Sequence, residues 1–248
     1  VISAMGVECA VLPTAVLSAH TAFPFPELSA FHDLTPVMEQ TMVHWQALHA
    51  DFDAIYSGFL GSSAQIHLLG ELIRTFRGPD TLLLIDPVMG DHGRIYRTYT
   101  PEMCRQLGAL AAEADLITPN LTEAALLLDE PYRAVPTRQA GVDQWLRRLS
   151  LDGARSVVIT GVSFTPGTVG AGCFDRRTGK VHFAMSAREE GAFSGTGDLF
   201  ASVLTGALVR GLGLTEAAGL AADFVSRCAA RTEEQGLPER EGVDFEPL

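Results

Sequence analysis

The sequence predicts an α/β fold in which helices cover a mainly parallel sheet. Short apolar runs alternate along the chain with amphipathic stretches, which is the pattern of strands and helices in turn. Several of these runs are apolar at every position, so both faces of the corresponding strands should be buried. The chain shows no internal repeat and no linker long enough to divide it, and we therefore expect a single domain over residues 1–248.

The predicted elements of the first half follow one another closely. Segment 7–18 indicates one strand or a pair of strands, and segment 36–49 a helix, because Met38, Met42 and Trp45 share one face. A strand, a helix, a strand and a helix are then expected in that order, at 52–61, 63–76, 80–91 (ending at Asp86-Pro87) and 101–112.

The second half continues the alternation and closes with two helices. A short strand at 115–120 is stopped by Pro119, and another strand is expected at 155–161. Strands at 170–175 and 180–185 are joined by a hairpin-like turn, RRTG. The remaining helices are expected at 121–129 and 137–151 and from about residues 197 and 215 onward.

The composition excludes several classes of function. Of the 248 residues, 47% are hydrophobic and 19% charged, enough to bury a large core. The net charge is −12 without any Lys/Arg cluster, so nucleic acid and anionic membranes are poor partners. The most apolar stretch, 199–209, is too short to span a bilayer, and no signal-peptide pattern points to secretion.

The cysteines and the single lysine exclude further kinds of site. The four cysteines are scattered and form no CxxC pair, so we expect reduced, buried thiols in a cytoplasmic protein, and no zinc site. Lys180 is the only lysine, and no GxxxxGK[ST] motif exists, which excludes a P-loop nucleotide site.

Small or polar residues stand at the expected carboxyl ends of the strands. These residues are Ser57-Gly58, Asp86-Pro87, Thr118-Pro119-Asn120 and Thr160-Gly161. Ligands of open α/β sheets bind outside the carboxyl ends of the strands. We therefore expect the functional site at this edge, together with the turn at 195–198.

That turn, Gly195-Thr196-Gly197-Asp198, directly precedes an apolar run and has two interpretations. In the first, Ser194 or Asp198 caps a helix and the glycines only make the turn. In the second, the backbone N–H groups of residues 195–197 bind an anion at the helix N-terminus, beside the Asp198 carboxylate.

Two further motifs contribute oxygen ligands. DPVMGDHG places Asp86 and Asp91 on one loop, and TPNLTEA places Asn120 and Glu123 on the first turn of a helix, facing one side. Turn capping and the helix dipole explain each motif separately. Next to a phosphate, however, such a set suits Mg²⁺, which prefers few carboxylates, several waters and phosphate oxygens.

Together these motifs contain the parts that phosphoryl transfer to an alcohol requires. The reaction needs a base for the hydroxyl proton, donors for the phosphoryl oxygens, and a metal that bridges the phosphates. Asp198, the amides of 195–197, and Asn120 with Glu123 through Mg²⁺ would supply all three without a P-loop lysine.

The motifs DPVMGDHGRIY, PNLTEA, VITGV and GTGD, in this order and spacing, resemble the ribokinase-like superfamily, and within it the pyridoxal kinases. The resemblance extends from about residue 4 to residue 245. It implies a three-layer α/β/α sandwich with a mainly parallel central sheet, usually in a homodimer. The implied reaction is the ATP-dependent phosphorylation of the 5′-hydroxymethyl group of pyridoxal, pyridoxamine or pyridoxine.

The resemblance also implies roles around the phosphates. Asp198 would be the catalytic base, and Gly195, Thr196 and Gly197 the anion hole. Asn120 and Glu123 would organise Mg²⁺ and its waters. Further residues would lie near the metal or the ATP phosphates, namely Asp86, Asp91, Thr118, Thr160 and Gly161, with segment 91–96 as a flexible lid.

The resemblance implies further contacts with the adenine ring of ATP and with the pyridine ring of the substrate. Phe224 and Cys228 would line the adenine side, although core packing explains them equally well. His20 and Thr21 match a pair beside the pyridine ring. Phe59 stands where the family often has a Tyr against that ring, so stacking is kept and a hydroxyl contact is lost.

Two alternatives stay open. Hydroxymethylpyrimidine kinases share DPVM but usually carry Cys at the position of Asp198, so Asp198 and Gly90-Asp91 favour the pyridoxal branch. The other alternative is a vitamin- or nucleotide-binding protein with little turnover. The match begins at the end of the family's first helix, so we expect this chain to be N-terminally incomplete and to lack the first strand.

Overall fold

The computed structural model describes residues 1–19, 26–188, 193–238 and 241–248. His20 and Thr21, the expected pyridine contacts, lie outside the described residues. The central sheet has six strands in the order β10-β9-β8-β7-β4-β3. These strands are β3 (Ala54–Ser57), β4 (Leu82–Ile85), β7 (Leu116–Ile117), β8 (Ser156–Val162), β9 (Thr168–Asp175) and β10 (Lys180–Ala187).

The sheet is mostly parallel, as predicted. Strands β3, β4, β7 and β8 pair in parallel, whereas β9 is antiparallel to both of its neighbours. Strand β10 therefore runs in the same direction as β8, and β9 alone is reversed. This single reversal returns the chain to the carboxyl edge of the sheet before α6 (Thr196–Val209) begins.

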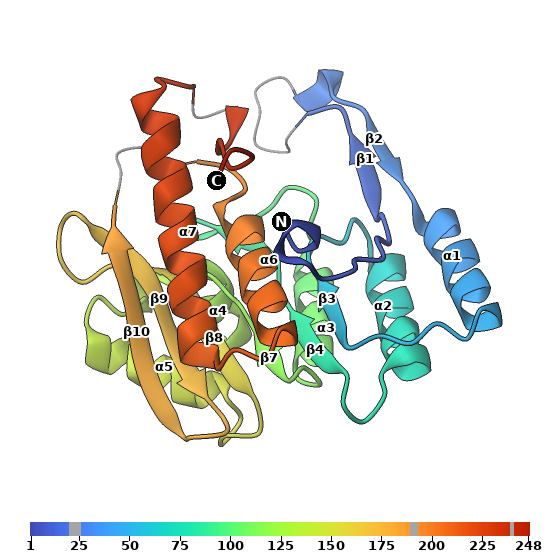
Figure 1. Ribbon diagram of the computed structural model, residues 1–248, viewed down its shortest axis with the longest axis horizontal. Coiled ribbons are helices and arrows are strands. Elements are labelled where there is room, and N and C mark those ends of the chain that lie inside the picture. Colours follow the sequence, from blue (N-terminus) through green and yellow to red (C-terminus); the bar gives the residue numbers. More distant parts are fainter. Residues whose placement is uncertain (20–25, 189–192, 239–240) are drawn as a thin grey trace.

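Alternating side chains give the sheet two apolar faces. On β4, Leu83 and Ile85 join one core and Leu84 joins the other. Burial of each such side chain contributes about 2 kcal/mol. One face is covered by α6 and α7 (Leu214–Glu234), in front of the sheet in Figure 1. The opposite core takes in residues of α1 (Thr35–Ala47), α2 (Ser63–Phe76), α3 (Pro101–Ala111), α4 (Leu121–Leu127) and α5 (Gln139–Leu149). The predicted three-layer sandwich is confirmed.

Helix starts follow local capping chemistry. The Ser62 hydroxyl accepts a hydrogen bond from the Gln65 amide at 3.4 Å, which places the start of α2 at Ser63. The Thr100 hydroxyl likewise accepts from the Met103 amide at 3.2 Å, and Pro101 occupies the first position of α3.

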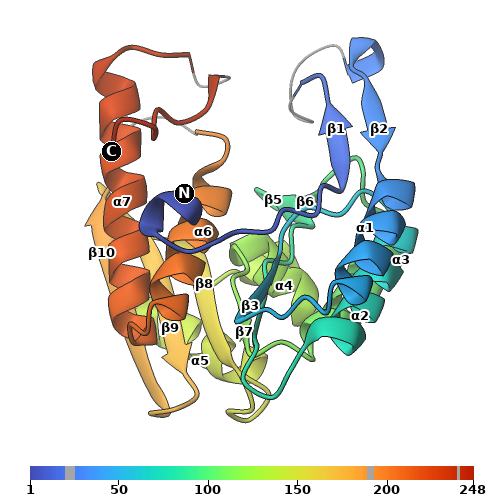
Figure 2. The same ribbon diagram turned by 45° about the vertical axis from the view of Figure 1, so that its right-hand side comes forward.

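A small second sheet was only partly predicted. Strand β1 (Ala15–Leu17) occupies a fraction of segment 7–18, and its antiparallel partner β2 (Phe31–Asp33) was not predicted. Figure 2 shows this pair next to α1, apart from the central sheet. The buried Gln65 side chain joins the pair to α2 by donating to the Thr14 carbonyl at 2.7 Å and to the Asp33 carboxylate at 3.1 Å.

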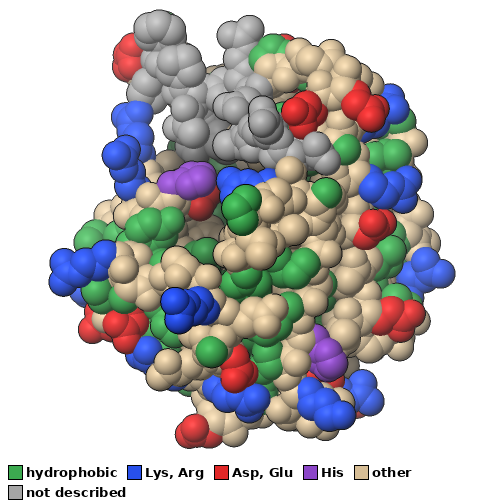
Figure 3. Space-filling view, turned by 90° about the vertical axis from the view of Figure 1, so that its left-hand side faces the viewer, with side chains coloured by type: hydrophobic (Ala, Val, Ile, Leu, Met, Phe, Trp, Pro, Cys, Tyr) green, Lys and Arg blue, Asp and Glu red, His purple; other side chains and the backbone are tan. Residues whose placement is uncertain are grey.

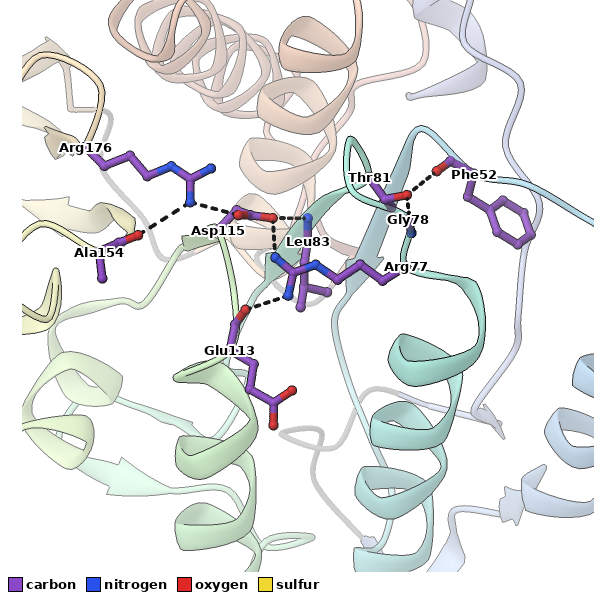
Figure 4. A network of polar contacts seen from close by, with 9 residues as sticks. All are labelled: Phe52, Arg77, Gly78, Thr81, Leu83, Glu113, Asp115, Ala154 and Arg176. Atoms are coloured by element: carbon purple, nitrogen blue, oxygen red, sulfur yellow. Dashed lines mark hydrogen bonds and ion pairs between the residues drawn. The ribbon is translucent and has the colours of Figure 1, made fainter.

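At the amino edge of the sheet, one carboxylate joins three segments (Figure 4). Asp115 accepts hydrogen bonds from Arg77 at 2.9 Å, from Arg176 at 2.8 Å and from the Leu83 amide at 2.9 Å. The exposed Lys180 begins β10 at this same edge. Its amine therefore lies at the end of the sheet opposite to the strand ends where the functional site was expected.

Charges are mixed on the surface, and the cysteines differ in burial. On the face seen in Figure 3, Lys and Arg side chains are interspersed with acidic and apolar ones. No helix within the described ranges is long and apolar enough to cross a membrane. All four cysteines are free; Cys173 and Cys228 are buried, but Cys9 is exposed and Cys104 half-buried. The expectation of buried thiols therefore holds for only two of them.

Candidate functional site

The carboxyl ends of adjacent strands bring the predicted polar residues together. The Asp86 amide, after β4, donates to the Ser57 carbonyl at the end of β3 at 2.9 Å. The Thr118 amide, after β7, donates to Ile85 of β4 at 3.3 Å. Asp198 lies in the first turn of α6.

Asp86 and Asp198 are electrostatically linked. Burial of Asp86, and secondly the charge of Asp198, raise the pKa of Asp86 to about 8, while the nearby Thr118 hydroxyl opposes the shift. Asp86 is only 7% exposed, and no ion pair among the described residues involves it. The two carboxyl groups are thus close enough for the charge of Asp198 to disfavour ionisation of Asp86.

Asn120 and Glu123 form a capping box at the start of α4. The Asn120 side-chain oxygen accepts from the amides of Thr122 at 2.8 Å and Glu123 at 3.0 Å. In return, the Glu123 carboxylate accepts from the Asn120 amide at 2.8 Å. The spacing of three residues between Asn120 and Glu123 therefore has a direct structural cause.

The same two side chains hold the loop that follows Asp86. The second Glu123 oxygen accepts from the Met89 amide at 3.0 Å, and the Asn120 amide group donates to the Gly90 carbonyl at 2.8 Å. Burial of Glu123, then the charge of Asp86, hold its pKa well above the ordinary value, although backbone N–H groups oppose this. Both Glu123 oxygens accept backbone hydrogen bonds, which fix the carboxyl group in place and leave it lone pairs for a water or a metal.

The resemblance implies Mg²⁺ at this edge of the sheet. Across the described ranges, no three His, Cys, Asp or Glu side chains converge to hold a metal. The buried Asp86 carboxyl nevertheless fits a divalent cation, which would favour its ionised form and would take its other ligands from water and phosphates. The assignment of Asp86 and Glu123 to a metal site stays a prediction.

The turn before Asp198 is shaped by glycine. Gly195, with φ +88°, is the N-cap of α6, so neither Ser194 nor Asp198 occupies the N-cap position. A Cβ atom added at Gly195 or Gly197 would meet no atom of the described residues within 4 Å. The backbone of this turn therefore borders open space, which suits the second interpretation of the motif.

Two buried hydroxyls at this edge form no regular hydrogen bond within the part of the chain that the structure describes. Ser57 Oγ and Thr118 Oγ1 make no hydrogen bond of good geometry with any described residue. Leaving a buried polar group unpaired costs about 1–3 kcal/mol, so these atoms indicate that a ligand or water completes them.

The expected phosphate contacts on β8 lie beside Asn120. The Thr160 amide donates to the Pro119 carbonyl at 2.9 Å, and Gly161, with φ +71°, forms part of a bulge in the strand. Asp91 is exposed, and its carboxylate accepts from the His92 amide at 2.7 Å. It lies on an unpredicted hairpin of β5 (Gly90–Asp91) and β6 (Arg94–Ile95).

Similarity to known proteins shows the family of the chain. Residues 1–241 match the family model described as phosphomethylpyrimidine kinase. The chain belongs to this family.

Similar members of the family include pyridoxal kinases. A pyridoxine/pyridoxal/pyridoxamine kinase from Bordetella avium is 33% identical over 186 residues, which are 72% of this chain and 60% of that relative. The chain thus spans less than two thirds of that relative's length.

Similar solved structures match a larger share of this chain than the Bordetella avium kinase does. A structure from Bacteroides thetaiotaomicron, provisionally described as a phosphomethylpyrimidine kinase and crystallised with pyridoxal, has a TM-score of 0.92 and 38% identity over 99% of this chain and 85% of that one. Pyridoxal kinase from Lactobacillus plantarum has a TM-score of 0.88 and 31% identity, over 100% and 86%. The resemblance to pyridoxal kinases is confirmed.

The residues expected to line the adenine ring and the pyridine ring differ in how exposed they are. Phe224 is half-buried against the α6–α7 core, whereas Cys228 is fully buried and has its pKa raised by burial to about 11. The structure therefore favours core packing for Cys228. The centroids of the Phe59 and Tyr99 rings are 6.4 Å apart. The backbone carbonyl of Phe59 accepts a hydrogen bond from the Thr14 hydroxyl at 3.0 Å.

Tyr56 was missed at the site, whereas Tyr96 is the last residue of the expected lid segment 91–96. Tyr56 of β3 faces the α6–α7 core, and its hydroxyl is 3.6 Å from the place of a Cβ on Gly58, so the ring leans towards the carboxyl edge. Burial, then Asp86 and Asp198, raise its pKa well above the ordinary value. Burial and Glu123 do the same for Tyr96. Tyr56 directly precedes Ser57, which was predicted at the end of a strand, so the sequence could have placed Tyr56 next to the site.

Proposed function

We propose that this chain is a vitamin B6 kinase, which transfers a phosphoryl group from ATP to the 5′-hydroxymethyl group of pyridoxal, pyridoxamine or pyridoxine. The observation that carries the proposal is Asp198 in the first turn of α6, beside Asp86 and directly after a glycine turn that borders open space. The printed names of the Bordetella and Lactobacillus relatives support the substrate class.

In this reaction Asp198 accepts the proton of the substrate hydroxyl as its oxygen attacks the γ-phosphorus of ATP. A bond forms between that oxygen and phosphorus, and the bond from phosphorus to the ADP oxygen breaks. The amides of Gly195, Thr196 and Gly197 donate to the phosphoryl oxygens as charge develops on them. Asp86, and Glu123 through water, would hold Mg²⁺, which would supply positive charge to the phosphates.

The other contacts are those that the family resemblance implies. Thr118, Thr160 and Gly161 would contact the ATP phosphates, together with Asp91 on the β5–β6 hairpin. The half-buried Phe224 would line the adenine side. His20, Thr21 and Phe59 would contact the pyridine ring. Free cysteines support a cytoplasmic location.

A homodimer is part of the proposal. Large apolar side chains are exposed on and around the β1–β2 sheet and α1, among them Val16 at 55%, Phe31 at 40% and Val43 at 68%. A two-stranded sheet on its own is marginally stable in water, and a second copy would cover it. Light scattering coupled to gel filtration should give twice the chain mass.

One second candidate is favoured by a specific observation. The matching family model is described as phosphomethylpyrimidine kinase, so hydroxymethylpyrimidine is the competing acceptor. Both acceptors carry a hydroxymethyl group on an aromatic ring, and the base and anion-binding turn would serve either.

The test measures ADP release from MgATP with pyridoxal, pyridoxamine, pyridoxine or hydroxymethylpyrimidine as acceptor. We expect turnover with the pyridine vitamers. Asp198→Asn should lower kcat by about 10²–10⁴-fold and leave ligand affinity nearly unchanged. Glu216→Gln, an exposed acidic residue in the first turn of α7, is the matched control.

Each other outcome has a definite meaning. Turnover with hydroxymethylpyrimidine alone would select the second candidate. Near-full activity of the Asn variant would remove Asp198 as the base. Tight ligand binding without turnover would leave a binding protein.

A further inference from the structure

The hairpin 90–95 is fastened to the rest of the molecule in two places. Its root is held at Met89 and Gly90 by Glu123 and Asn120, as described above. Its tip is held separately, at Gly93. The two attachments differ in the number and the burial of the groups that make them.

Thr122 makes the first contact with the tip. Its hydroxyl accepts a hydrogen bond from the Gly93 amide at 2.9 Å. Thr122 is 4% exposed and lies on the first turn of α4, between the two residues of the capping box. Its hydroxyl position is therefore fixed by the same helix start that holds the root.

Tyr132 makes the second contact, from the 3-10 turn η3 (Tyr132–Ala134). A Cβ atom at Gly93 would lie 2.5 Å from Cδ1 of the Tyr132 ring, so the ring packs directly on the glycine backbone. Gly93 also has φ +76°, which disfavours any side chain. Only glycine fits this position without displacing the ring.

The root is the stronger attachment. It combines a buried carboxylate and a side-chain amide, each bonded to the backbone of the loop. The tip has one hydrogen bond and one ring, and Tyr132 is 43% exposed. Rupture of the single Gly93 bond, with displacement of that ring, would free the tip while Met89 and Gly90 stay in place.

We propose that Thr122 is a positioning residue, which holds Gly93 so that the hairpin tip and Asp91 lie over the nucleotide phosphates, and that the lid opens at its tip only, above a fixed root. The nucleotide part rests on the proposed function; the attachment itself does not.

Amide hydrogen exchange tests the attachment without turnover. Thr122→Val keeps the shape of the side chain and removes the acceptor. Exchange at the Gly93 amide should become about 3- to 10-fold faster, the change expected from losing one hydrogen bond, while the Met89 amide keeps its rate. Thr75→Val, an exposed helical threonine on α2, should change neither. An unchanged Gly93, or equal acceleration at Met89, would overturn the proposal.

Kinetics test the nucleotide part. Thr122→Val should raise the KM for MgATP about 3- to 10-fold with kcat altered less than about twofold, and Thr122→Ser should restore the KM. Faster exchange at Gly93 with an unchanged KM would overturn the positioning role. Absence of turnover in the unmodified chain would defeat the proposed function instead and would leave the exchange result standing.

Discussion

Asp86 lies within electrostatic reach of Asp198, whose charge opposes the ionisation of Asp86 at the end of β4. The pKa of Asp86 is about 8 in the folded chain, against an ordinary value of 3.8. A carboxyl whose pKa is raised by folding favours the folded state fully only below its unfolded pKa. Between about pH 4 and pH 8 the unfolded chain ionises first, so this contribution to stability is lost as the pH rises.

Asp86→Asn should therefore stabilise the chain at high pH. We expect its free energy of unfolding at pH 8 to exceed that of the unmodified chain by about 1–2 kcal/mol, the gain typical of relieving a strained functional site. At pH 4 the difference should vanish, because the carboxyl is then protonated in the folded chain. Urea unfolding at both pH values measures this; an equal gain at pH 4 would contradict the electrostatic cause.

Tyr56→Phe should change the pH dependence of turnover. The Tyr56 hydroxyl lies near Asp86 and Asp198, and a phenol stabilises a neighbouring carboxylate by donating to it. Without it, the pKa of the base should rise, and the acid limb of the kcat/KM profile should move to higher pH. The expected loss of kcat is about tenfold. An unmoved acid limb would show that the hydroxyl does not act on the base.

Asn120→Ala should reduce both stability and nucleotide binding. Loss of the cap of α4 should cost about 1 kcal/mol of unfolding free energy, and the Gly90 carbonyl loses its donor. Thr100→Ala removes the cap of α3 at a similar cost in stability but does not touch the loop. Only Asn120→Ala should raise the KM for MgATP; a matching rise in Thr100→Ala would point to general destabilisation.

Asp115→Ala should destabilise the amino edge of the sheet. The change removes the acceptor for Arg77, Arg176 and the Leu83 amide, and we expect a loss of about 2–3 kcal/mol in thermal or urea unfolding. Glu102→Ala breaks the exposed pair with Arg105 and should cost less than about 0.5 kcal/mol. Similar losses for both variants would mean that burial does not decide the value of these contacts.

The long elements were predictable because their signals are local. Helix α2 is capped by the residue before it, and β4 is apolar on both faces, so each could be inferred from its own segment. Strand β2 (Phe31–Asp33) is short and exposed, and its partner is distant in sequence; no periodicity indicates such a strand. The β5–β6 hairpin depends on contacts with Asn120 and Thr122, which only the folded chain brings near.

The candidate site was predictable to a similar degree. Asp86, Asn120, Glu123 and Asp198 stand in recognisable motifs at strand ends, so their proximity follows from the topology of a parallel sheet. The use of both Glu123 oxygens by backbone amides, and the position of Tyr56, depend on how side chains point in three dimensions. A linear sequence does not contain that information.

The position of Lys180 has a chemical consequence for the proposed substrate. Pyridoxal carries an aldehyde, and aldehydes condense with lysine amines to form imines. The only lysine of the sequence lies on the amino edge, across the sheet from Asp198. The sequence holds no other lysine, so pyridoxal bound at the proposed site would meet no lysine amine of this sequence that could trap its aldehyde.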